Sequence, residues 1–443
     1  TVTKMKVLKF GGTSVGSAQR MKEVAKLITD GEKKIVVLSA MSGTTNTLVE
    51  ISDYLYKKNP EGANEIINKL ETKYKQHIDE LFATPEYKQK GLEIIKSHFD
   101  YIRSYTKDLF TLFEEKVVLA QGELISTAMV NFYLQECGVK SVLLPALEFM
   151  RTDKNAEPDP IYIKEKLLAQ LELYPDADIY ITQGFICRNA YGEIDNLQRG
   201  GSDYTASLIG AAINASEIQI WTDIDGMHNN DPRIVDKTAP VRQLHFEEAA
   251  ELAYFGAKIL HPTCIQPAKY ANIPVRLLNT MDPEAPGTLI SNDTEKGKIK
   301  AVAAKDNITA IKIKSSRMLL AHGFLRKVFE IFESYQTSID MICTSEVGVS
   351  VTVDNTKHLN EILDDLKKYG TVTVDKEMCI ICVVGDLEWE NVGFEAKALD
   401  AMRDIPVRMI SFGGSNYNIS FLIRECDKKV ALQSLSDMLF NGK

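Results

Sequence analysis

Apolar and polar residues alternate along the start of the chain in a way that predicts strands and helices in turn. Residues 6–10 form a short apolar run, and residues 35–40 form a continuous one, as expected of a parallel strand that is buried on both faces. Between these runs, apolar residues recur at the spacing of one helix face, at Met21, Val24, Ala25 and Ile28. The chain therefore opens with a strand, a loop, a helix and a second strand.

A long helical stretch follows this opening. Residues 46–57 and about 60–115 are mostly helical by pattern, with breaks at Pro60 and Pro85, and the charged second stretch looks like an insertion beside a sheet. Strand-like runs then return at residues 117–120, 141–145, 179–185 and 218–223. Because helical segments separate most of these runs, the pattern predicts an α/β fold with a mainly parallel sheet. Ligands of such sheets bind outside the carboxyl ends of the strands.

The character of the sequence changes near residues 279–298, where proline, glycine and charged residues suggest a linker. A weak internal repeat follows, and each copy reads as a helix, a strand, a turn and an alternating strand. The copies span residues 323–332, 338–342 and 347–353, and then 393–402, 406–410 and 417–423. We therefore predict two domains, at 1–295 and 296–443. The second domain would contain two α+β units. The first unit spans about 307–375, and the second spans about 376–443 together with a strand at about 298–305.

The amino-acid composition and net charge limit the classes of protein to which the chain can belong. With 443 residues, 44% hydrophobic and 26% charged, the chain has the make-up of an ordinary globular protein of two or three domains. A net charge of −9 argues against nucleic-acid binding, and no apolar run approaches the length of a membrane span. Seven scattered cysteines and the lack of a signal-peptide pattern lead us to expect a cytoplasmic protein. We interpret the lone Cys379 and Cys382 pair as core residues.

The first candidate motif is Lys9-Phe10-Gly11-Gly12-Thr13-Ser14, at the end of the first predicted strand. Glycines let backbone N–H groups approach a phosphate closely, and the N-terminus of the next helix favours an anion. Lys9 closes the strand, so its ammonium can reach over the loop. From these residues alone, a phosphate loop and a tight turn with a solvated lysine fit equally well.

A second glycine pair precedes a helix at Arg199-Gly200-Gly201-Ser202-Asp203. Arg199 is suited to bidentate binding of a carboxylate, and Ser202 or Asp203 can cap the helix. The alternative is a simple helix cap beside a surface arginine. Recurrence of a strand, a glycine pair and a helix in one domain favours a ligand site.

Polar residues also follow other predicted strands. Thr222 and Asp223 come after an apolar run, where hydroxyl and acidic groups suit contacts with a ribose or a metal. Turn formation explains the nearby Asp225-Gly226 and Asp231-Pro232 equally well. Ser39, Thr45 and Glu123 also lie at or after strand ends. A buried Glu123 needs a partner, and a substrate ammonium would be one.

Seven motifs, kept in order along nearly the whole chain, resemble those of the aspartokinase family. They are K-F-G-G-T-S at 9–14, V-V-L-S-A-M-S-G-T-T-N at 36–46, G-E at 122–123, R-G-G-S-D at 199–203, W-T-D-I-D-G at 221–226, D-P-R at 231–233 and F-G-A-K-I-L-H-P at 255–262. The first and fourth together are highly specific. The tail resembles the paired ACT domains of that family, and residues 318–325 and 338–346 resemble its lysine-sensitive, monofunctional class.

The resemblance implies an amino-acid-kinase α/β/α sandwich followed by two ACT units. It implies that ATP, with Mg²⁺, phosphorylates L-aspartate to 4-phospho-L-aspartate, the first step toward lysine, threonine and methionine. Phosphoryl transfer needs in-line positioning and charge neutralisation more than covalent chemistry. No general base is needed, because the attacking carboxylate is already ionised at neutral pH.

The resemblance also implies roles for single residues. Lys9 would stabilise the transferring phosphoryl group, Asp203 would orient Lys9 or the metal, Arg199 would bind the substrate α-carboxylate and Glu123 its ammonium. The substrate positions are Ser39, Thr45, Glu123, Arg199, Gly200, Gly201 and Ser202, and the nucleotide positions are Lys9, Gly11, Gly12, Ser14, Thr222, Asp223, His228, Arg233 and Lys258. His228 departs from the tyrosine of relatives, so a ring-stacking or hydroxyl contact is not implied there.

Lysine is the implied effector, and the implied contacts lie in the first ACT unit. They are Met318, Ala321, Gly323, Phe324, Leu325, Ser338, Asp340, Ser345 and Glu346, with Ala321 standing where a serine is usual. Asp340 and Glu346 could take the effector's ammonium groups, or they could be ordinary surface acids. Arg408 replaces Asp340 in the second unit and would repel an ammonium, so we expect no lysine there. By resemblance, ACT units pair between subunits, which gives a homodimer or a tetramer.

Two other functions remain open at this point. A kinase for glutamate or acetylglutamate would share most of the motifs, although Arg199 with Glu123 favours a free amino acid. A catalytically inactive amino-acid sensor would keep the ACT pair, but the presence of Lys9, Arg199 and Asp203 argues against it.

Overall fold

The structure is a computed structural model that describes residues 4–107, 109–257, 260–316 and 322–441. The chain forms two compact units, and neither is continuous in sequence. Unit 1 consists of residues 1–227 and 259–292, and unit 2 consists of residues 228–258 and 293–443. Unit 2 therefore includes a segment, 228–258, that the sequence pattern led us to assign to the N-terminal domain.

Unit 1 is built on a mainly parallel sheet, in which strands β12-β11-β7-β1-β2-β4-β3 follow one another in space. Its strands are β1 (Lys6–Phe10), β2 (Lys34–Leu38), β3 (Ser141–Leu144), β4 (Ile179–Gln183), β7 (Ile218–Thr222), β11 (Val275–Asn279) and β12 (Thr288–Ser291), with a hairpin of β5 (Ile186–Arg188) and β6 (Ile194–Asn196). β1 lies between β7 and β2 and is parallel to both. All five positions of β2 and of β4 are buried, which is typical of parallel strands covered on both faces.

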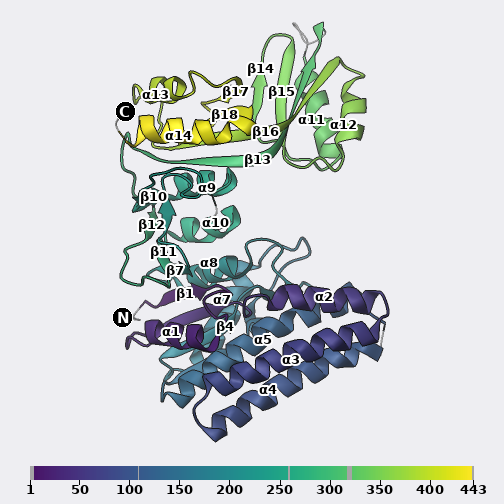
Figure 1. The fold of residues 1–443 in the computed structure, drawn as a ribbon, viewed down its shortest axis with the longest axis vertical. Coiled ribbons are helices and arrows are strands. Elements are labelled where there is room, and N and C mark those ends of the chain that lie inside the picture. The colour runs from purple at the N-terminus through teal and green to yellow at the C-terminus, as the bar shows by residue number, and fades with distance from the viewer. Residues whose placement is uncertain (1–3, 108, 258–259, 317–321, 442–443) are drawn as a thin grey trace. The chain divides into compact units, whose positions relative to one another are not determined.

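Helices account for most of the rest of unit 1. They are α1 (Ala18–Ile28), α2 (Thr44–Tyr56), α3 (Pro60–Leu81), α4 (Pro85–Ser104), α5 (Leu112–Glu136), α6 (Ala146–Phe149), α7 (Pro160–Glu172), α8 (Gly201–Ile213) and α10 (Pro262–Ala271), with a 3₁₀ turn at Tyr105–Lys107. Helices α2 to α5 lie side by side (Figure 1). Pro60 and Pro85 each occupy the first turn of a helix, where proline costs no hydrogen bond, so the predicted breaks are confirmed.

The strand predicted at residues 117–120 is wrong, because these residues lie inside helix α5. The helix has buried side chains on every side, so its apolar run has no helical period to distinguish it from a buried strand. α5 is also long and apolar enough to cross a membrane, yet 83% of its most apolar window is buried inside the protein. It is therefore the core helix of unit 1.

Unit 2 contains a six-stranded antiparallel sheet in the order β14-β15-β13-β16-β18-β17. Its strands are β13 (Ile299–Lys314), β14 (Ile342–Thr344), β15 (Gly348–Val353), β16 (Thr371–Gly385), β17 (Val407–Ser411) and β18 (Asn418–Arg424). β13 and β16 pair along almost their whole length, with register shifts between Lys305 and Ala310 (Figure 1). Cys379 and Cys382 lie in β16 as buried free thiols.

Each end of the β13–β16 pair carries its own helices and hydrophobic core. The remaining elements of unit 2 are α9 (Phe246–Tyr254), α11 (Phe324–Ser334), α12 (Leu359–Leu366), α13 (Phe394–Ala401) and α14 (Lys428–Leu439), a 3₁₀ turn at Glu425–Asp427, and the short strands β9 (Pro240–Val241) and β10 (Gln243–His245), while β8 (Met227–His228) spans the boundary of the units. Ile311 packs with α11 and α12, and Val302 packs with α13 and α14. The predicted α/β fold followed by α+β units is confirmed, although β14 begins at Ile342 rather than at residue 338.

Candidate active site

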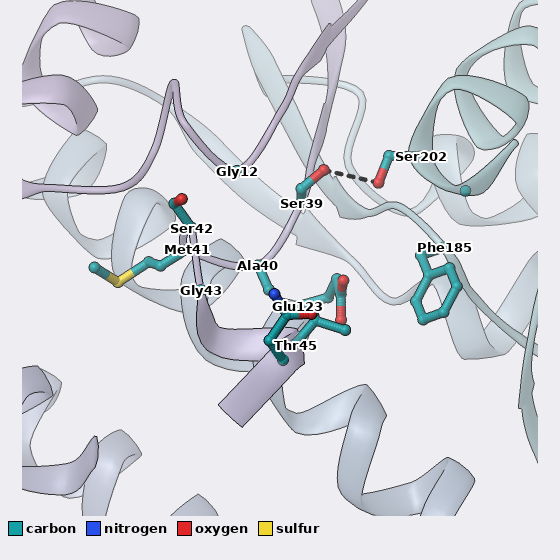
Figure 2. A pocket seen from close by; sticks show the side chains of 12 residues that line it. Gly12, Ser39, Ala40, Met41, Ser42, Gly43, Thr45, Glu123, Phe185 and Ser202 are labelled. Carbon is teal, nitrogen blue, oxygen red and sulfur yellow. Dashed lines mark hydrogen bonds between the residues drawn. The ribbon is translucent and has the colours of Figure 1, made fainter. Parts of the chain in front are cut away.

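A cavity of about 270 Å³ lies in unit 1, where strands β1, β2 and β4 end (Figure 2). It is lined by Gly12, Ser39, Ala40, Met41, Ser42, Gly43, Thr45, Asn46, Glu123, Phe185, Gly201 and Ser202. Half of these are residues that the sequence singled out, namely Gly12, Ser39, Thr45, Glu123, Gly201 and Ser202. The cavity is thus at the edge of the sheet where ligands of parallel sheets bind.

Lys9 and Asp203 meet beside this cavity. Lys9 is near the end of β1, and Asp203 is in the first turn of α8, directly after the cavity residue Ser202. The Lys9 ammonium nitrogen lies 2.8 Å from Asp203 Oδ1, and both side chains are largely buried, at 12% and 19% exposure. The contact is an ion pair without the alignment of a hydrogen bond. A partly buried ion pair of this kind holds the Lys9 ammonium in one place beside the loop that follows β1.

The loop after β2 contacts the glycine-pair loop before α8 through a pair of hydroxyls. Ser39 Oγ, after β2, lies 2.9 Å from Ser202 Oγ, and Figure 2 shows the two side chains facing each other. Helix α8 has Gly200 as its N-cap without a side-chain cap, so the prediction that Ser202 or Asp203 caps this helix is wrong. Their side chains are instead engaged with Ser39 and Lys9.

Gly200 shows why this turn needs glycine. Its φ is +71°, and a β-carbon on it would lie 2.5 Å from Cys264 Sγ of α10. Both the left-handed backbone and the close approach of α10 therefore exclude a larger residue. The neighbouring Arg199 is exposed and, among the residues that the structure describes, has no hydrogen bond or ion pair. Burial of the His261 imidazole lowers its pKa, and the positive charge of Arg199 lowers it further.

Glu123 is the buried acid of the cavity. It projects from α5, is 3% exposed, and its Oε2 atom has no hydrogen-bond partner within the described part of the chain. Burial raises the pKa of this carboxyl from 4.5 to about 8, although the backbone N–H groups of Glu123 and Ala40 act in the opposite direction. An unpaired buried carboxylate has a strong tendency to bind a cation.

The loop after β1 packs closely against the loop after β2. A β-carbon on Gly12 would lie 3.0 Å from the Ala40 carbonyl oxygen, so the glycine allows close packing against the loop after β2. The carbonyls of Gly11 and Gly12 accept the N–H groups of Ser14 and Ser42 at 3.1 Å. The Ser14 side chain is buried, and its hydroxyl has no partner among the described residues.

Sequence reasoning missed several residues of the cavity, including Met41, Asn46 and Phe185. Met41 and Asn46 belong to the quoted 36–46 motif, so the motif contained that signal. Phe185 comes two residues after the end of β4 and has a φ of +73°, a strained value for a residue with a side chain. Its N–H donates to Thr205 Oγ1 at 3.0 Å, which ties this turn to α8. The sequence around Phe185 contains no signal that predicts its positive φ.

The nucleotide candidates lie in both units and are described within each. In unit 1, Thr222 ends β7 and its carbonyl accepts the Thr280 N–H at 2.8 Å, while Asp223 is exposed. In unit 2, His228 Nδ1 lies 2.8 Å from Thr238 Oγ1. Arg233, also in unit 2, is paired with Asp231 at 2.8 Å and is largely exposed. Lys258 lies outside the described residues.

In the effector region of unit 2, Asp340 is already paired. Its side chain is 1% exposed, its Oδ1 accepts the Tyr254 hydroxyl at 2.7 Å, and the Lys305 ammonium lies 3.2 Å away. The other oxygen, Oδ2, is buried without a partner among the described residues. Asp340 thus already binds one ammonium group.

The other predicted effector residues surround the ends of α11 and β15. Gly323 is the N-cap of α11, Phe324 is buried, Leu325 is 38% exposed, and Ser338, Ser345 and Glu346 are exposed. Met318 and Ala321 lie outside the described residues. Arg408 pairs with Asp375 of β16 at 2.9 Å, so its charge is balanced by a neighbouring carboxylate.

The described residues contain no cluster of three or more His, Cys, Asp or Glu side chains that could hold a metal ion. A Mg²⁺ that arrives with nucleotide phosphates needs only one or two protein carboxylates, since phosphate oxygens and water complete its shell. Asp203 fits the role of such a Mg²⁺ ligand, because it carries a largely buried carboxylate beside the cavity.

Comparisons with known proteins show which families the chain resembles. The amino acid kinase family model matches residues 4–279, and an ACT domain model matches residues 381–439. The chain is 36% identical to "Aspartokinase 1, chloroplastic" of Arabidopsis thaliana over 460 residues, which cover 98% of this chain and 80% of that protein.

Two solved structures of E. coli aspartokinase III are similar over nearly the whole chain. The complex with aspartate and ADP, in the R-state, has a TM-score of 0.84 at 32% identity and covers 99% of this chain and 100% of that one. The complex with lysine and aspartate, in the T-state, has a TM-score of 0.79 at 33% identity with the same coverage.

Proposed function

Because this chain belongs to the aspartokinase family and is an aspartate kinase, we propose that it transfers the γ-phosphoryl group of ATP to the side-chain carboxylate of L-aspartate. The products are ADP and 4-phospho-L-aspartate. We assign this reaction to the first step of the pathway to lysine, threonine and methionine. We further propose that lysine inhibits it by feedback, because a similar kinase has been solved with lysine bound.

The observation that carries the proposal is the buried, unpaired Glu123 carboxylate in a cavity of about 270 Å³. An amino-acid ammonium neutralises this carboxylate, and the exposed Arg199 guanidinium takes the α-carboxylate. Thr45, Ser39 and Ser202 offer hydroxyls to the rest of the substrate. An acetylated amine carries no positive charge, so the same cavity disfavours acetylglutamate.

Lys9 is the residue that we assign to the transferring phosphoryl group. Its ammonium sits at the glycine loop, held by Asp203, so its charge is in place before the reaction begins. The aspartate side chain attacks as a carboxylate, which needs no proton removal at neutral pH. The chain's main contributions are therefore alignment of the two substrates and neutralisation of phosphate charge.

The nucleotide is assigned to Gly11, Gly12 and Ser14 at its phosphates, and to Thr222 and Asp223 at the end of β7. His228, Arg233 and Lys258 remain nucleotide candidates on the strength of the sequence motifs alone. Mg²⁺, which supplies charge neutralisation at the phosphates when bound, would come with ATP, and Asp203 is the carboxylate that fits it.

Feedback inhibition is assigned to the first ACT unit of unit 2. The effector's ammonium groups would use Asp340 and Glu346, and Asp340 already binds the Lys305 ammonium, which supports its affinity for such a group. A ligand at this position inhibits only if it binds the inactive arrangement more tightly than the active one. We also propose a cytoplasmic homodimer, which light scattering would test against twice the 49.6 kDa of one chain.

An assay of ADP release tests the reaction directly. Purified protein with ATP and Mg²⁺ is given L-aspartate, L-glutamate or N-acetylglutamate, and we expect turnover with aspartate. Turnover with glutamate alone, or with neither amino acid, would contradict the proposal.

Replacing Lys9 tests its assigned part in the same assay. Lys9→Ala removes the charge beside the transferring group, so we expect kcat to fall by at least about a hundredfold. Lys6→Ala is the matched control, because Lys6 is on the same strand but makes only a loose 3.5 Å pair with Glu32 at the surface. Near-normal kcat in the Lys9 variant would show that the assignment is wrong.

A further inference from the structure

The helical insertion formed by α3 and α4 has so far had no part in the site. One of its side chains, Tyr74 of α3, is 1% exposed, and its ring packs edge-to-face on Phe99 of α4 with centroids 5.7 Å apart. Its hydroxyl lies 2.5 Å from Thr44 Oγ1. Thr44 is the first residue of α2 and is itself 2% exposed. The insertion therefore reaches the helix that borders the cavity.

Thr44 stands between the two walls of the amino-acid part of the cavity. The next residue in the chain, Thr45, lines the cavity from α2. On its other side, the Thr44 methyl carbon lies 3.4 Å from where a β-carbon on Gly122 would be, and Gly122 directly precedes Glu123 in α5. A movement of Thr44 would therefore displace both Thr45 and Glu123.

The first turn of α2 lacks the usual side-chain cap. Its N-cap is Gly43, with a φ of +83° and no side-chain hydrogen bond. The Tyr74 hydroxyl bonds the Thr44 side chain and not a backbone N–H group, so it fixes the first residue of the helix without capping it. Loss of that hydroxyl would leave Thr44 Oγ1 buried beside an apolar ring.

Tyr74 acts here as a neutral group. Burial raises the pKa of its phenol above the ordinary value, and the nearby charge of Glu123 raises it further. The hydroxyl therefore stays protonated at any pH at which the protein works, and it can orient Thr44 without adding a second charge next to Glu123.

We propose that Tyr74 is a positioning residue of the amino-acid subsite, whose hydroxyl fixes Thr44 and thereby sets the distance between Thr45 and Glu123. This gives the helical insertion a part in substrate binding. The inference rests on the proposed function in one respect, namely that the cavity holds the amino-acid substrate through Glu123.

Tyr74→Phe is the direct test, because it keeps the ring and removes only the hydroxyl. We expect the KM for aspartate, and the Kd for aspartate measured by calorimetry, to rise about fivefold to tenfold. The KM for ATP should change less than about twofold, and kcat less than about threefold. Thr44→Val removes the partner hydroxyl and should give the same pattern, which keeps the test possible if one variant folds poorly.

The double variant Tyr74→Phe with Thr44→Val distinguishes this hydrogen bond from two unrelated defects. Because both single changes remove the same interaction, we expect the double variant to be no worse than either single one. Effects on KM that simply multiply in the double variant would overturn the proposal.

Tyr180→Phe is the matched control for a purely structural role. Tyr180 is also 1% exposed in unit 1, and its hydroxyl donates to the Tyr174 carbonyl at 2.6 Å, near the start of β4 and away from the cavity lining. We expect it to lower the melting temperature without changing the KM for aspartate. An equal rise in KM for Tyr74→Phe and Tyr180→Phe, or no rise in either, would overturn the inference.

The wild-type protein separates this inference from the proposed function. If it binds or turns over glutamate in place of aspartate, the proposed substrate is wrong, and the same comparison is made with the KM and Kd for glutamate. If the wild type acts on aspartate and the Tyr74 variant is unchanged, the positioning role alone is wrong.

Discussion

At the scale of single residues, burial changes the chemistry of Glu123. Its carboxyl is 3% exposed with one oxygen unpaired, and burial raises its pKa to about 8. In the empty cavity at pH 7 the proton is therefore mostly retained. A substrate ammonium pairs with the ionised form, so binding must release that proton.

This predicts a pH-dependent affinity for aspartate. As pH rises from 6 to 8, the cost of deprotonating Glu123 falls, so the KM for aspartate should fall by up to about tenfold per pH unit and level off above pH 8. Initial rates at saturating ATP, measured at several pH values in this range, would give the profile.

Glu123→Gln is the control for that profile. The amide is close in size but does not titrate, so its KM should be high and nearly independent of pH between 6 and 8. An unchanged slope in this variant would show that another group controls the pH dependence.

A contact between Lys9 and Asp203 was predictable from sequence, because a motif contains each of the two residues. The 9–14 and 199–203 motifs brought Lys9 and Asp203 to 2.8 Å. Tyr74 could not have been found in this way, because its contact with Thr44 depends on how α3 packs against α2. Phe185 was missed for a similar reason, since its backbone strain arises from the tertiary structure around α8.

At the scale of elements, the turn before α8 is where small changes should matter most. Gly200 combines a φ of +71° with a β-carbon position only 2.5 Å from Cys264 Sγ. Gly200→Ala should therefore lower the free energy of unfolding by about 2–4 kcal/mol, the sum of backbone strain and overpacking. Urea denaturation of the two proteins would measure it.

Gly31→Ala separates these two causes. Gly31 has a φ of +89°, but a β-carbon on it would meet nothing within 4 Å, so only the strain of about 1 kcal/mol is expected. If the two variants lose equal stability, the close packing of α10 contributes nothing.

Elements with a clear period were predicted well, whereas a continuous apolar run fits a buried strand and a buried helix alike. Helix α1 buries Met21, Val24, Ala25 and Ile28 as expected, because one face is apolar and the other polar. Helix α5 has no polar face, so its residues 117–120 were taken for a strand. The hydrophobic pattern distinguishes a helix from a strand only when one face of the element is exposed to water.

At the scale of the whole molecule, the path of the chain was the feature hardest to foresee. Hydrophobic pattern reveals elements in order, but it does not show that residues 228–258 pack with a segment that begins at residue 293. The α/β part and the antiparallel part were both recognisable, since each has its own periodicity and repeat.

The proposed inhibition by lysine belongs to the scale of the whole molecule, and a single substitution can test it. Asp340→Ala removes the buried carboxylate that pairs with Lys305 and Tyr254, so we expect the lysine concentration for half inhibition to rise at least tenfold. ADP release at fixed substrate, titrated with lysine, would measure the change.

Asp354→Ala is the matched control, because Asp354 also pairs with Lys305, at 3.0 Å, yet is 42% exposed and is not an assigned effector contact. It should leave half inhibition within about twofold. Inhibition of the wild type by threonine and not by lysine would contradict the assignment of the effector.

The pairing of β13 with β16 has a consequence for how the protein can be re-engineered. Ala310 and Asp375, at the two ends of the first ACT unit, are register partners on adjacent antiparallel strands. That unit is thus inserted into the second one, with its entry and exit side by side. A single continuous gene segment encodes it, and a sensor for a different metabolite could be exchanged there as one cassette.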